Sequence, residues 1–240
     1  MNNPSHPLSL AAALAAFSAA HASAAAVVSY DFENATPTST SVAASTVEIG
    51  WTAAAVSRGS GLATPAGSDG SAPEGNPATG TAFSSARWSL SGSFNAASTM
   101  YLEFTVGTTG SPFDLEQISF DLRRSSLGPK DWDFRSSLDG YAVSLGSQND
   151  MAALAFNSYS ISLGSAFEDL NSPVTFRLYA FDADDLNHTL RIDNLNIEGA
   201  LVPEPHQWAA LAGLGLLGFA ACRRARRGHG GAPGSKASSL

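Results

Sequence analysis

Cysteine is almost absent from this chain of 240 residues, which contains only Cys222. A single cysteine cannot form an intramolecular disulfide, and it cannot supply the thiolate ligands of a structural zinc site. The fold is therefore expected to depend on a hydrophobic core. Cys222 itself lies at the end of an apolar segment. We interpret it as a small apolar residue of that segment, with lipidation as the alternative.

Charge is also scarce, because charged residues make up only 14% of the chain. Between residues 25 and 202 there are 8 Lys and Arg against 20 Asp and Glu, a difference of −12. The remaining five basic residues lie beyond residue 222. Since nucleic-acid phosphates are bound by clustered Lys and Arg, this acidic region is not expected to bind nucleic acid.

No apolar run reaches the roughly 20 residues of an ordinary transmembrane helix. A shorter run of 13 residues, LSLAAALAAFSAA, spans 8–20 and is followed by the small residues Ala22-Ser23-Ala24. This order is typical of a signal peptide with its cleavage site, although Lys and Arg are missing from its first residues. The sequence predicts a signal helix over 1–24 that signal peptidase removes. An N-terminal core helix is the alternative, but the Ala-rich run has no amphipathic period.

A second short apolar run lies near the other end of the chain. The segment 208–222, WAALAGLGLLGFAAC, carries no charge and would form a helix of about 22 Å, against a hydrocarbon core of about 30 Å. Trp208 is suited to one membrane interface and the cluster 223–227 to the other. The basic residues of that cluster are Arg223, Arg224, Arg226 and Arg227. By the positive-inside rule they stay in the cytoplasm, so residues 25–201 are expected outside it.

Pro203, Glu204 and Pro205 precede this run, separated from it by His206 and Gln207. The ordered combination of this triplet, a short apolar span and an arginine cluster resembles the PEP-CTERM sorting signal, over residues 202–227. The resemblance implies that a membrane-embedded exosortase cuts at or near 203–205 and releases the protein to the cell surface or the exopolysaccharide matrix. The tail 228–240 is longer than such signals usually carry. Because it is rich in Gly and Ser, we expect it to be disordered.

Between residues 25 and 201, short strand patterns recur between turn residues, and no repeat of fixed period is present. The expected strands cover 27–32, 99–106, 117–124, 141–145, 158–163, 174–181 and 189–198. In the last of these the apolar phase changes between Ile192 and Leu195, which predicts a β-bulge near Asp193-Asn194. The Gly, Ser and Pro-rich stretch 59–80 is expected to be a flexible loop.

These patterns predict an all-β fold, an antiparallel β-sandwich of jelly-roll type over residues 25–201. We expect it to be flanked by the N-terminal signal helix and the short C-terminal transmembrane helix.

Signals for catalysis are sparse in the expected sandwich. His188 is interpreted as a turn residue before the last strand, because no motif supplies it with a partner. The sequence Gly59-Ser60-Gly61 lacks the spacing of a nucleophile elbow. The acidic residues Asp182, Asp184 and Asp185 could offer oxygen ligands to calcium, but the EF-hand spacing is absent. We interpret them as a solvated acidic turn.

A different acidic pair joins the two ends of the expected sandwich. The expected sandwich begins with the sequence Tyr30-Asp31-Phe32-Glu33 and ends with the sequence Arg191-Ile192-Asp193-Asn194. This arrangement resembles jelly-roll carbohydrate-binding modules, in which acidic residues of the first and last strands hold a structural calcium. The resemblance implies that Glu33 and Asp193 are calcium ligands. A salt bridge such as Glu33 with Arg191 is the alternative, and no other cofactor is expected.

Three tryptophans, Trp51, Trp88 and Trp132, also have two interpretations. Core packing is the first, and stacking platforms for sugar rings are the second.

Together these features predict an exported, non-catalytic surface or matrix protein that is sorted by its C-terminal signal. Signal peptidase and exosortase are its expected processing partners, and the membrane holds it before processing. Extracellular polysaccharide is the expected ligand, of unspecified identity. Two alternatives stay open: a secreted carbohydrate-active enzyme with paired carboxylates, and an adhesion module that remains in the membrane.

Overall fold

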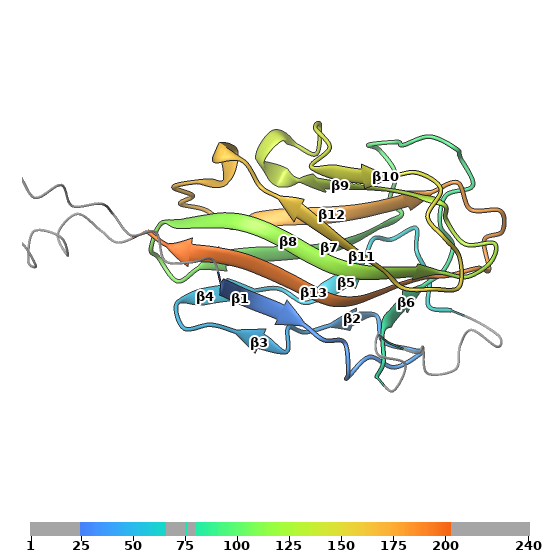
Figure 1. The fold of residues 1–240 in the computed structure, drawn as a ribbon, viewed down its shortest axis with the longest axis horizontal. Coiled ribbons are helices and arrows are strands. Elements are labelled where there is room, and N and C mark those ends of the chain that lie inside the picture. The colour runs from blue at the N-terminus through green and yellow to red at the C-terminus, as the bar shows by residue number, and fades with distance from the viewer. Residues whose placement is uncertain (1–24, 66–74, 76–79, 203–240) are drawn as a thin grey trace, which may run out of the picture.

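The computed structural model describes residues 25–65, 75 and 80–202, which form two antiparallel β-sheets packed face to face (Figure 1). Sheet A has the strand order β11-β8-β13-β1-β3, and β6 also pairs with β13. Sheet B has the order β10-β9-β12-β7-β5-β2, and β4 also pairs with β7. The predicted all-β antiparallel sandwich is therefore confirmed.

The strands of sheet A are β1 (Ala25–Tyr30), β3 (Thr46–Val47), β6 (Phe83–Ser85), β8 (Phe113–Arg124), β11 (Asn157–Ser162) and β13 (Leu190–Leu201). Those of sheet B are β2 (Ser41–Val42), β4 (Trp51–Ala53), β5 (Val56–Arg58), β7 (Tyr101–Thr108), β9 (Asp131–Ser136), β10 (Gly146–Gln148) and β12 (Val174–Phe181). Within the described residues, helix is limited to the short 3-10 turns η2 (Ser137–Asp139) and η3 (Ser165–Phe167).

The core lies between the sheets and is rich in aromatic rings. Phe120 of sheet A stacks on Phe134 of sheet B, with ring centroids 5.5 Å apart. Tyr30 of sheet A lies 5.9 Å from Phe104 of sheet B. Successive strand residues point to opposite faces of a sheet, so the alternating apolar residues of β7, β8 and β12 all enter this layer. The large aromatic surface buried there supplies the stability that the scarce cysteine cannot.

Strand β13 occupies the middle of sheet A, between β1 and β8. Its register with β8 shifts between Asp193 and Asn196, which confirms the predicted bulge. Asn194 takes the left-handed conformation with φ of 48°, which Asn tolerates better than most residues. Because of the bulge, Ile192 and Leu195 both face the core although three positions separate them.

The expected strand over 141–145 is wrong. Tyr141 has a positive φ of 64°, which is not a strand conformation. In addition, two side chains bind the backbone of residues 141–143. The Asp139 carboxylate accepts hydrogen bonds from Ala142 N at 3.1 Å and Val143 N at 2.8 Å. Arg135 donates to the carbonyls of Tyr141 and Ala142. Backbone groups satisfied in this way do not need a neighbouring strand.

The neighbouring segment, by contrast, forms the unexpected strand β9. Trp132 lies on its inward face, 3% exposed, and Trp51 and Trp88 are 7% and 0% exposed. All three indoles therefore pack in the core, and the stacking-platform interpretation is wrong for each of them.

Several sequence predictions lie outside the described residues. These are the signal helix over 1–24, positions 66–74 and 76–79 of the expected loop, and everything after Val202. Among the residues that the structure does describe, no helix is long and apolar enough to cross a membrane.

Arg58 connects the two sheets from the inside. It starts on β5 of sheet B and donates from Nε to Ser85 Oγ at 2.9 Å and from Nη2 to Ser84 O at 2.5 Å, both on β6 of sheet A. Its third nitrogen binds the carbonyl of Ser39, and its guanidinium lies 4.2 Å from the centroid of the Phe83 ring. Burial lowers the pKa of Arg58 to about 10, so the side chain remains charged at neutral pH.

We expect Arg58→Met to lower the unfolding free energy by about 2 kcal/mol, because buried acceptors lose a charged donor. The thermal midpoint should fall by roughly 5 °C for a domain of this size. Arg87→Met is the matched control, since Arg87 is exposed and carries the same charge. Equal midpoints for the two variants would contradict a bridging role for Arg58.

Candidate functional site

The structure brings Glu33 and Asp193 to one corner of sheet A. This follows from the antiparallel pairing of β1 with β13, in which Tyr30 lies opposite Leu195. Thr81 is near both carboxylates. Its backbone N donates to Glu33 Oε2 at 3.2 Å, and its carbonyl oxygen and the Asp193 carboxylate both border Gly75. A Cβ built on Gly75 would lie 2.7 Å from both Thr81 O and Asp193 Oδ2.

Glycine backbone approaches these carboxylates at two points, and at Gly75 a Cβ would also meet the backbone oxygen of Thr81, which cannot move aside as a side chain can. A side chain at Gly75 would collide with Asp193, and one at Gly80 would collide with Glu33 Oε1. Oxygen atoms are the ligands that calcium takes in proteins. The corner thus offers two carboxylates and at least one carbonyl oxygen, and the close approach of the glycine backbone leaves no room for a competing side chain.

A third carboxylate, Asp121, was missed at the sequence level. It lies directly opposite Asp193 in the β8–β13 register, and the two are 7% and 1% exposed. Asn194 connects them, because its backbone N donates to Asp193 Oδ1 and its Nδ2 donates to Asp121 Oδ2, both at 2.8 Å. The bulge that places Asn194 here therefore helps to hold two like charges side by side.

Within the described ranges, no group of three His, Cys, Asp or Glu side chains is arranged to hold a metal ion. A cation at this corner would therefore need backbone oxygens such as Thr81 O in addition to the side chains.

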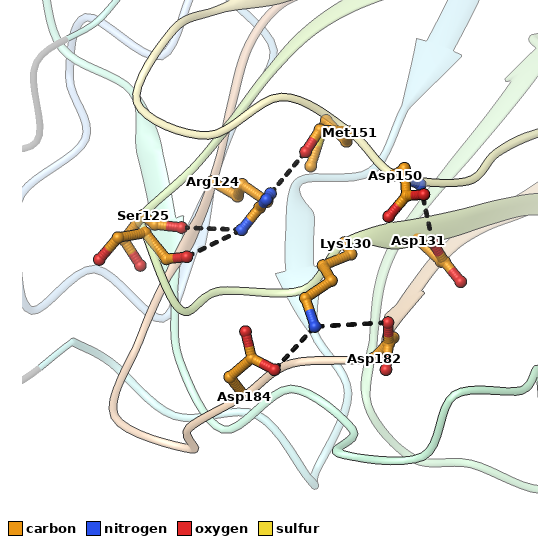
Figure 2. A network of polar contacts seen from close by, with 9 residues as sticks. Arg124, Ser125, Lys130, Asp131, Asp150, Met151, Asp182 and Asp184 are labelled. Atoms are coloured by element: carbon orange, nitrogen blue, oxygen red, sulfur yellow. Dashed lines mark hydrogen bonds and ion pairs between the residues drawn. The ribbon is translucent and has the colours of Figure 1, made fainter.

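The acidic turn after β12 has a lysine at its centre (Figure 2). Lys130 Nζ lies 2.7 Å from Asp184 Oδ1 and 3.7 Å from Asp182 Oδ2. The hydrogen bond to Asp184 is the main cause of the raised pKa of Lys130. The third member, Asp185, accepts a hydrogen bond from Asn187 N at 2.7 Å. The ammonium group thus occupies the position that a cation would take, in agreement with a solvated acidic turn.

Figure 2 also shows how the neighbouring loops are held. Arg124 donates to the carbonyl of Met151 at 2.5 Å and reaches the carbonyl of Ser125 at 3.5 Å. Asp131 Oδ1 accepts a hydrogen bond from the backbone N of Asp150 at 3.0 Å. These contacts tie a long loop to the edge of the sandwich, which is a structural role.

His188 lies in the turn before β13, as expected. Its Nδ1 is 3.1 Å from Ser125 Oγ, a contact that sequence reasoning missed because the two residues are distant in the chain. The same Ser125 hydroxyl accepts a hydrogen bond from Thr189 N at 2.9 Å. Ser125 therefore closes the end of the β8–β13 pair.

The outer face of sheet B carries an aromatic and charged cluster that was also missed. Arg177 of β12 lies between two tyrosine rings, 4.1 Å from the centroid of Tyr101 and 4.0 Å from that of Tyr141. Its Nε donates to Glu103 Oε2 at 2.7 Å. We call these four residues the Arg177 cluster. Tyr101, Glu103 and Arg177 occupy the outward positions of their strands, whereas Tyr141 comes from the loop after η2.

Electrostatics hold the cluster together. Burial by itself lowers the pKa of Arg177, but hydrogen bonding to Tyr179 and Glu103 outweighs it, and the net pKa is raised. Burial raises the pKa of Tyr141, and the positive charge of Arg177 opposes that rise. The guanidinium therefore stays charged, and the phenol stays neutral, throughout the physiological range.

A second arginine, Arg135, lies directly opposite Arg177 in the β9–β12 register, on the same face. Arg135 makes a two-pronged contact with Asp133, through Nε to Oδ1 at 3.1 Å and Nη2 to Oδ2 at 2.8 Å. Its guanidinium lies 3.7 Å from the centroid of the Phe94 ring. Phe94 in turn packs edge-on against Tyr179 at 5.2 Å. The half-exposed Tyr101 and Tyr141 are thus presented by a rigid layer beneath and beside them.

Comparison with solved structures finds distant likenesses over most of the sandwich. The K3 cleaved adhesin domain of Lys-gingipain from Porphyromonas gingivalis is 15% identical, with a TM-score of 0.40, covering 73% of this chain and 98% of that one. The xylan-binding module CBM15 is 13% identical, with a TM-score of 0.37, covering 64% and 93%.

A third likeness is the module CBM27-1 of Caldicellulosiruptor saccharolyticus, solved in complex with mannohexaose. It is 12% identical, with a TM-score of 0.32, covering 57% of this chain and 88% of that one. No curated protein sequence matches the chain.

The end of the chain gives a specific result. The family model of the PEP-CTERM protein-sorting motif matches residues 201–227. The match begins at Leu201, the last residue of β13, and includes Pro203, Glu204 and Pro205 as well as the arginine cluster. The chain therefore carries a PEP-CTERM protein-sorting motif, joined directly to the last strand of a β-sandwich.

Proposed function

We propose that this protein is a non-catalytic surface protein that binds extracellular polysaccharide through its β-sandwich. The sorting motif over 201–227 carries the first part of the proposal, because such a motif indicates export across the inner membrane to the cell surface. The sandwich ends where the motif begins: the backbone N of Val202 still donates to Pro112 O at 2.9 Å. The folded domain is thus followed directly by the sorting motif.

The processing pathway is part of the proposal. Signal peptidase removes residues 1–24, the segment 208–222 holds the chain in the membrane, and an exosortase cuts at or near Pro203-Glu204-Pro205. Trp208 and the cluster Arg223, Arg224, Arg226 and Arg227 set the orientation of that segment. A span of about 22 Å is short for a hydrocarbon core of about 30 Å, which suits a transient anchor better than a permanent one.

Replacing Pro203, Glu204 and Pro205 together with alanine should block processing. We expect the chain to accumulate in the membrane fraction with its arginine cluster intact, as measured by mass spectrometry of C-terminal peptides. Pro233→Ala is the control, because this proline lies in the tail beyond the matched motif. If the wild-type surface form keeps Arg226 and Arg227, the protein is a membrane-retained adhesion module instead.

The polysaccharide-binding part of the proposal rests on the Arg177 cluster. Tyrosine combines a flat apolar ring with a polar hydroxyl, and a sugar ring has apolar C–H faces and polar hydroxyl edges. Arg177 and Glu103 supply donors and acceptors beside the two rings, and their 2.7 Å contact fixes both side chains. A half-exposed, preorganised layer of this kind loses little side-chain entropy when it binds a ligand.

The double variant Tyr101→Ala, Tyr141→Ala should weaken binding to the host exopolysaccharide about tenfold. This estimate assigns about 0.7 kcal/mol to each ring, within the range measured for aromatic contacts. Affinity electrophoresis in gels that contain the polysaccharide measures the change, and thermal melting verifies folding. Val143→Ala is the control, because this exposed residue belongs to the same loop as Tyr141 but not to the cluster. Release of reducing sugars by the wild type would instead support a carbohydrate-active enzyme.

We further propose that Glu33 and Asp193 bind a structural calcium together with Thr81 O. The support is the shared corner, the burial of Asp193 and the glycine backbone at Gly75 and Gly80. Calcium bound there stabilises the joint between the first and last strands without taking part in any reaction.

Calcium at about 100 times its dissociation constant should therefore raise the thermal midpoint by roughly 5–10 °C, and chelation should reverse the effect. Glu33→Gln and Asp193→Asn should each abolish the response. Glu48→Gln is the matched control, since Glu48 is exposed and lies outside this corner. An equal calcium response in all three variants would rule out the site.

A further inference from the structure

A group of exposed apolar side chains lies at the end of the sandwich where β13 finishes. Its members are Val47, the last residue of β3, Ile49 in the turn that follows, and Leu201, the last residue of β13. All three are exposed, Ile49 to 97%. A Cβ built on Gly50 would lie 3.1 Å from Leu201 Cδ1, so the end of β13 adjoins the turn that carries Ile49 (Figure 1). We call these three residues the apolar patch.

The turn that presents Ile49 is fixed by backbone hydrogen bonds. Trp51 N donates to Glu48 O at 3.0 Å across the turn. Gly50, with a φ of 90°, takes the third position of a type II turn, where a positive φ favours glycine. Thr109 N, from the loop after β7, donates to Gly50 O at 2.9 Å. The backbone therefore cannot direct the Ile49 side chain inward without breaking these bonds.

The position of the apolar patch in the chain indicates what covers it. Leu201 is seven residues before Trp208, the first residue of the proposed membrane segment, and seven extended residues span at most about 25 Å. The patch therefore stays within about 25 Å of the membrane interface while the chain is anchored. The opposite end of the sandwich is farther away, because β8 runs from Phe113, opposite Leu201, to Arg124, and 12 strand residues extend for about 40 Å.

Charge does not favour contact between this end and a membrane, so the attraction has to be apolar. Residues 25–202 contain 12 more acidic than basic residues, and Glu48 is exposed between Val47 and Ile49. Anionic lipid would repel such a surface, whereas lipid without net charge would not. Transfer of a fully exposed isoleucine from water to an apolar environment favours the buried state about tenfold to hundredfold.

We propose that the apolar patch docks onto the surface of a lipid bilayer of low net charge while the chain is anchored. Its three side chains enter the boundary between headgroups and hydrocarbon, and the opposite end of the sandwich points away from the lipid. Pro203 follows Leu201 by two residues, so docking keeps the sorting triplet at the bilayer surface, where the proposed exosortase cuts. The inference rests on the proposed anchoring by residues 208–222 and adds a second contact with the membrane.

The docking depends on the anchor. One fully exposed isoleucine with two smaller apolar areas beside it gives weak affinity by itself, in the way that a single lipid chain gives only marginal membrane binding. The anchor makes the contact intramolecular and raises its effective concentration. Cleavage of the anchor should therefore also release the patch, and the processed protein would leave the membrane.

The test uses the full chain in phosphatidylcholine vesicles that carry nitroxide quenchers near the headgroup end of their acyl chains. A fluorophore is attached to Ile49→Cys in a Cys222→Ala background, and its emission should be strongly quenched. Leu154→Cys in the same background is the matched control and should stay unquenched. Leu154 is 62% exposed, and its backbone N donates to the carbonyl of Arg124 at the far end of β8.

A second labelled position tests the isoleucine itself. With the fluorophore on Val47→Cys, Ile49→Ser should lower the ratio of docked to undocked chain about tenfold, as measured from the quenched fraction. Leu154→Ser should leave this ratio unchanged, and added phosphatidylglycerol should lower it. Thermal melting should be the same for all variants, because the replaced side chains are exposed.

A label on the native Cys222 separates the docking from the anchor. Quenching at Cys222 with none at Ile49→Cys would overturn the docking and leave the anchor intact, while no quenching at either would overturn both. Equal quenching at Ile49→Cys and Leu154→Cys would show adsorption without a defined patch and refute the proposal. So would loss of iodide access to the Ile49→Cys label in detergent without lipid, which would show that another part or another copy of the chain covers the patch.

Discussion

The pairing of β13 with two partners is the contact on which the rest of this structure depends. β13 runs for 12 residues in the middle of sheet A, with β1 on one side and β8 on the other. Its buried Leu190, Ile192, Leu195 and Ile197 form much of the core layer beneath it. Because β1 opens the sandwich and β13 ends it, this pairing closes the domain, and the matched motif begins at Leu201, the last residue of β13.

The β-bulge in β13 determines which polar side chains lie together beside this pairing. One extra residue at Asn194 turns the strand without interrupting the core, and the same residue donates hydrogen bonds to Asp121 and Asp193. A regular strand here would have to direct either Ile192 or Leu195 towards solvent. The bulge therefore resolves a packing requirement and at the same time creates a corner with several carboxylates next to Thr81 and its flanking glycines.

The outer faces of the two sheets differ in how they use scarce positive charge. On the outer face of sheet B, Arg135 and Arg177 are each paired with a carboxylate and stacked against aromatic rings, among them the half-exposed Tyr101 and Tyr141. On sheet A two arginines lie opposite each other at a small cavity. In an acidic protein with so few cations, the positive charge of the outer faces is thus confined to a few defined points.

The sequence by itself determined the strands whose alternation is regular, such as 117–124 and 174–181, because burial of one face imposes a period of two. It also determined the bulge, since the apolar phase slips there, and the sorting motif, which is read as an ordered linear pattern. It could not determine that 141–145 is a loop, because the Asp139 and Arg135 side chains that satisfy its backbone are recognisable only in three dimensions. Nor could it assemble the Arg177 cluster, the Asp121–Asp193 pair or the apolar patch. Each joins residues that are distant in the chain, and only the tertiary structure, by fixing the strand register and the path of the loops, decides which side chains become neighbours.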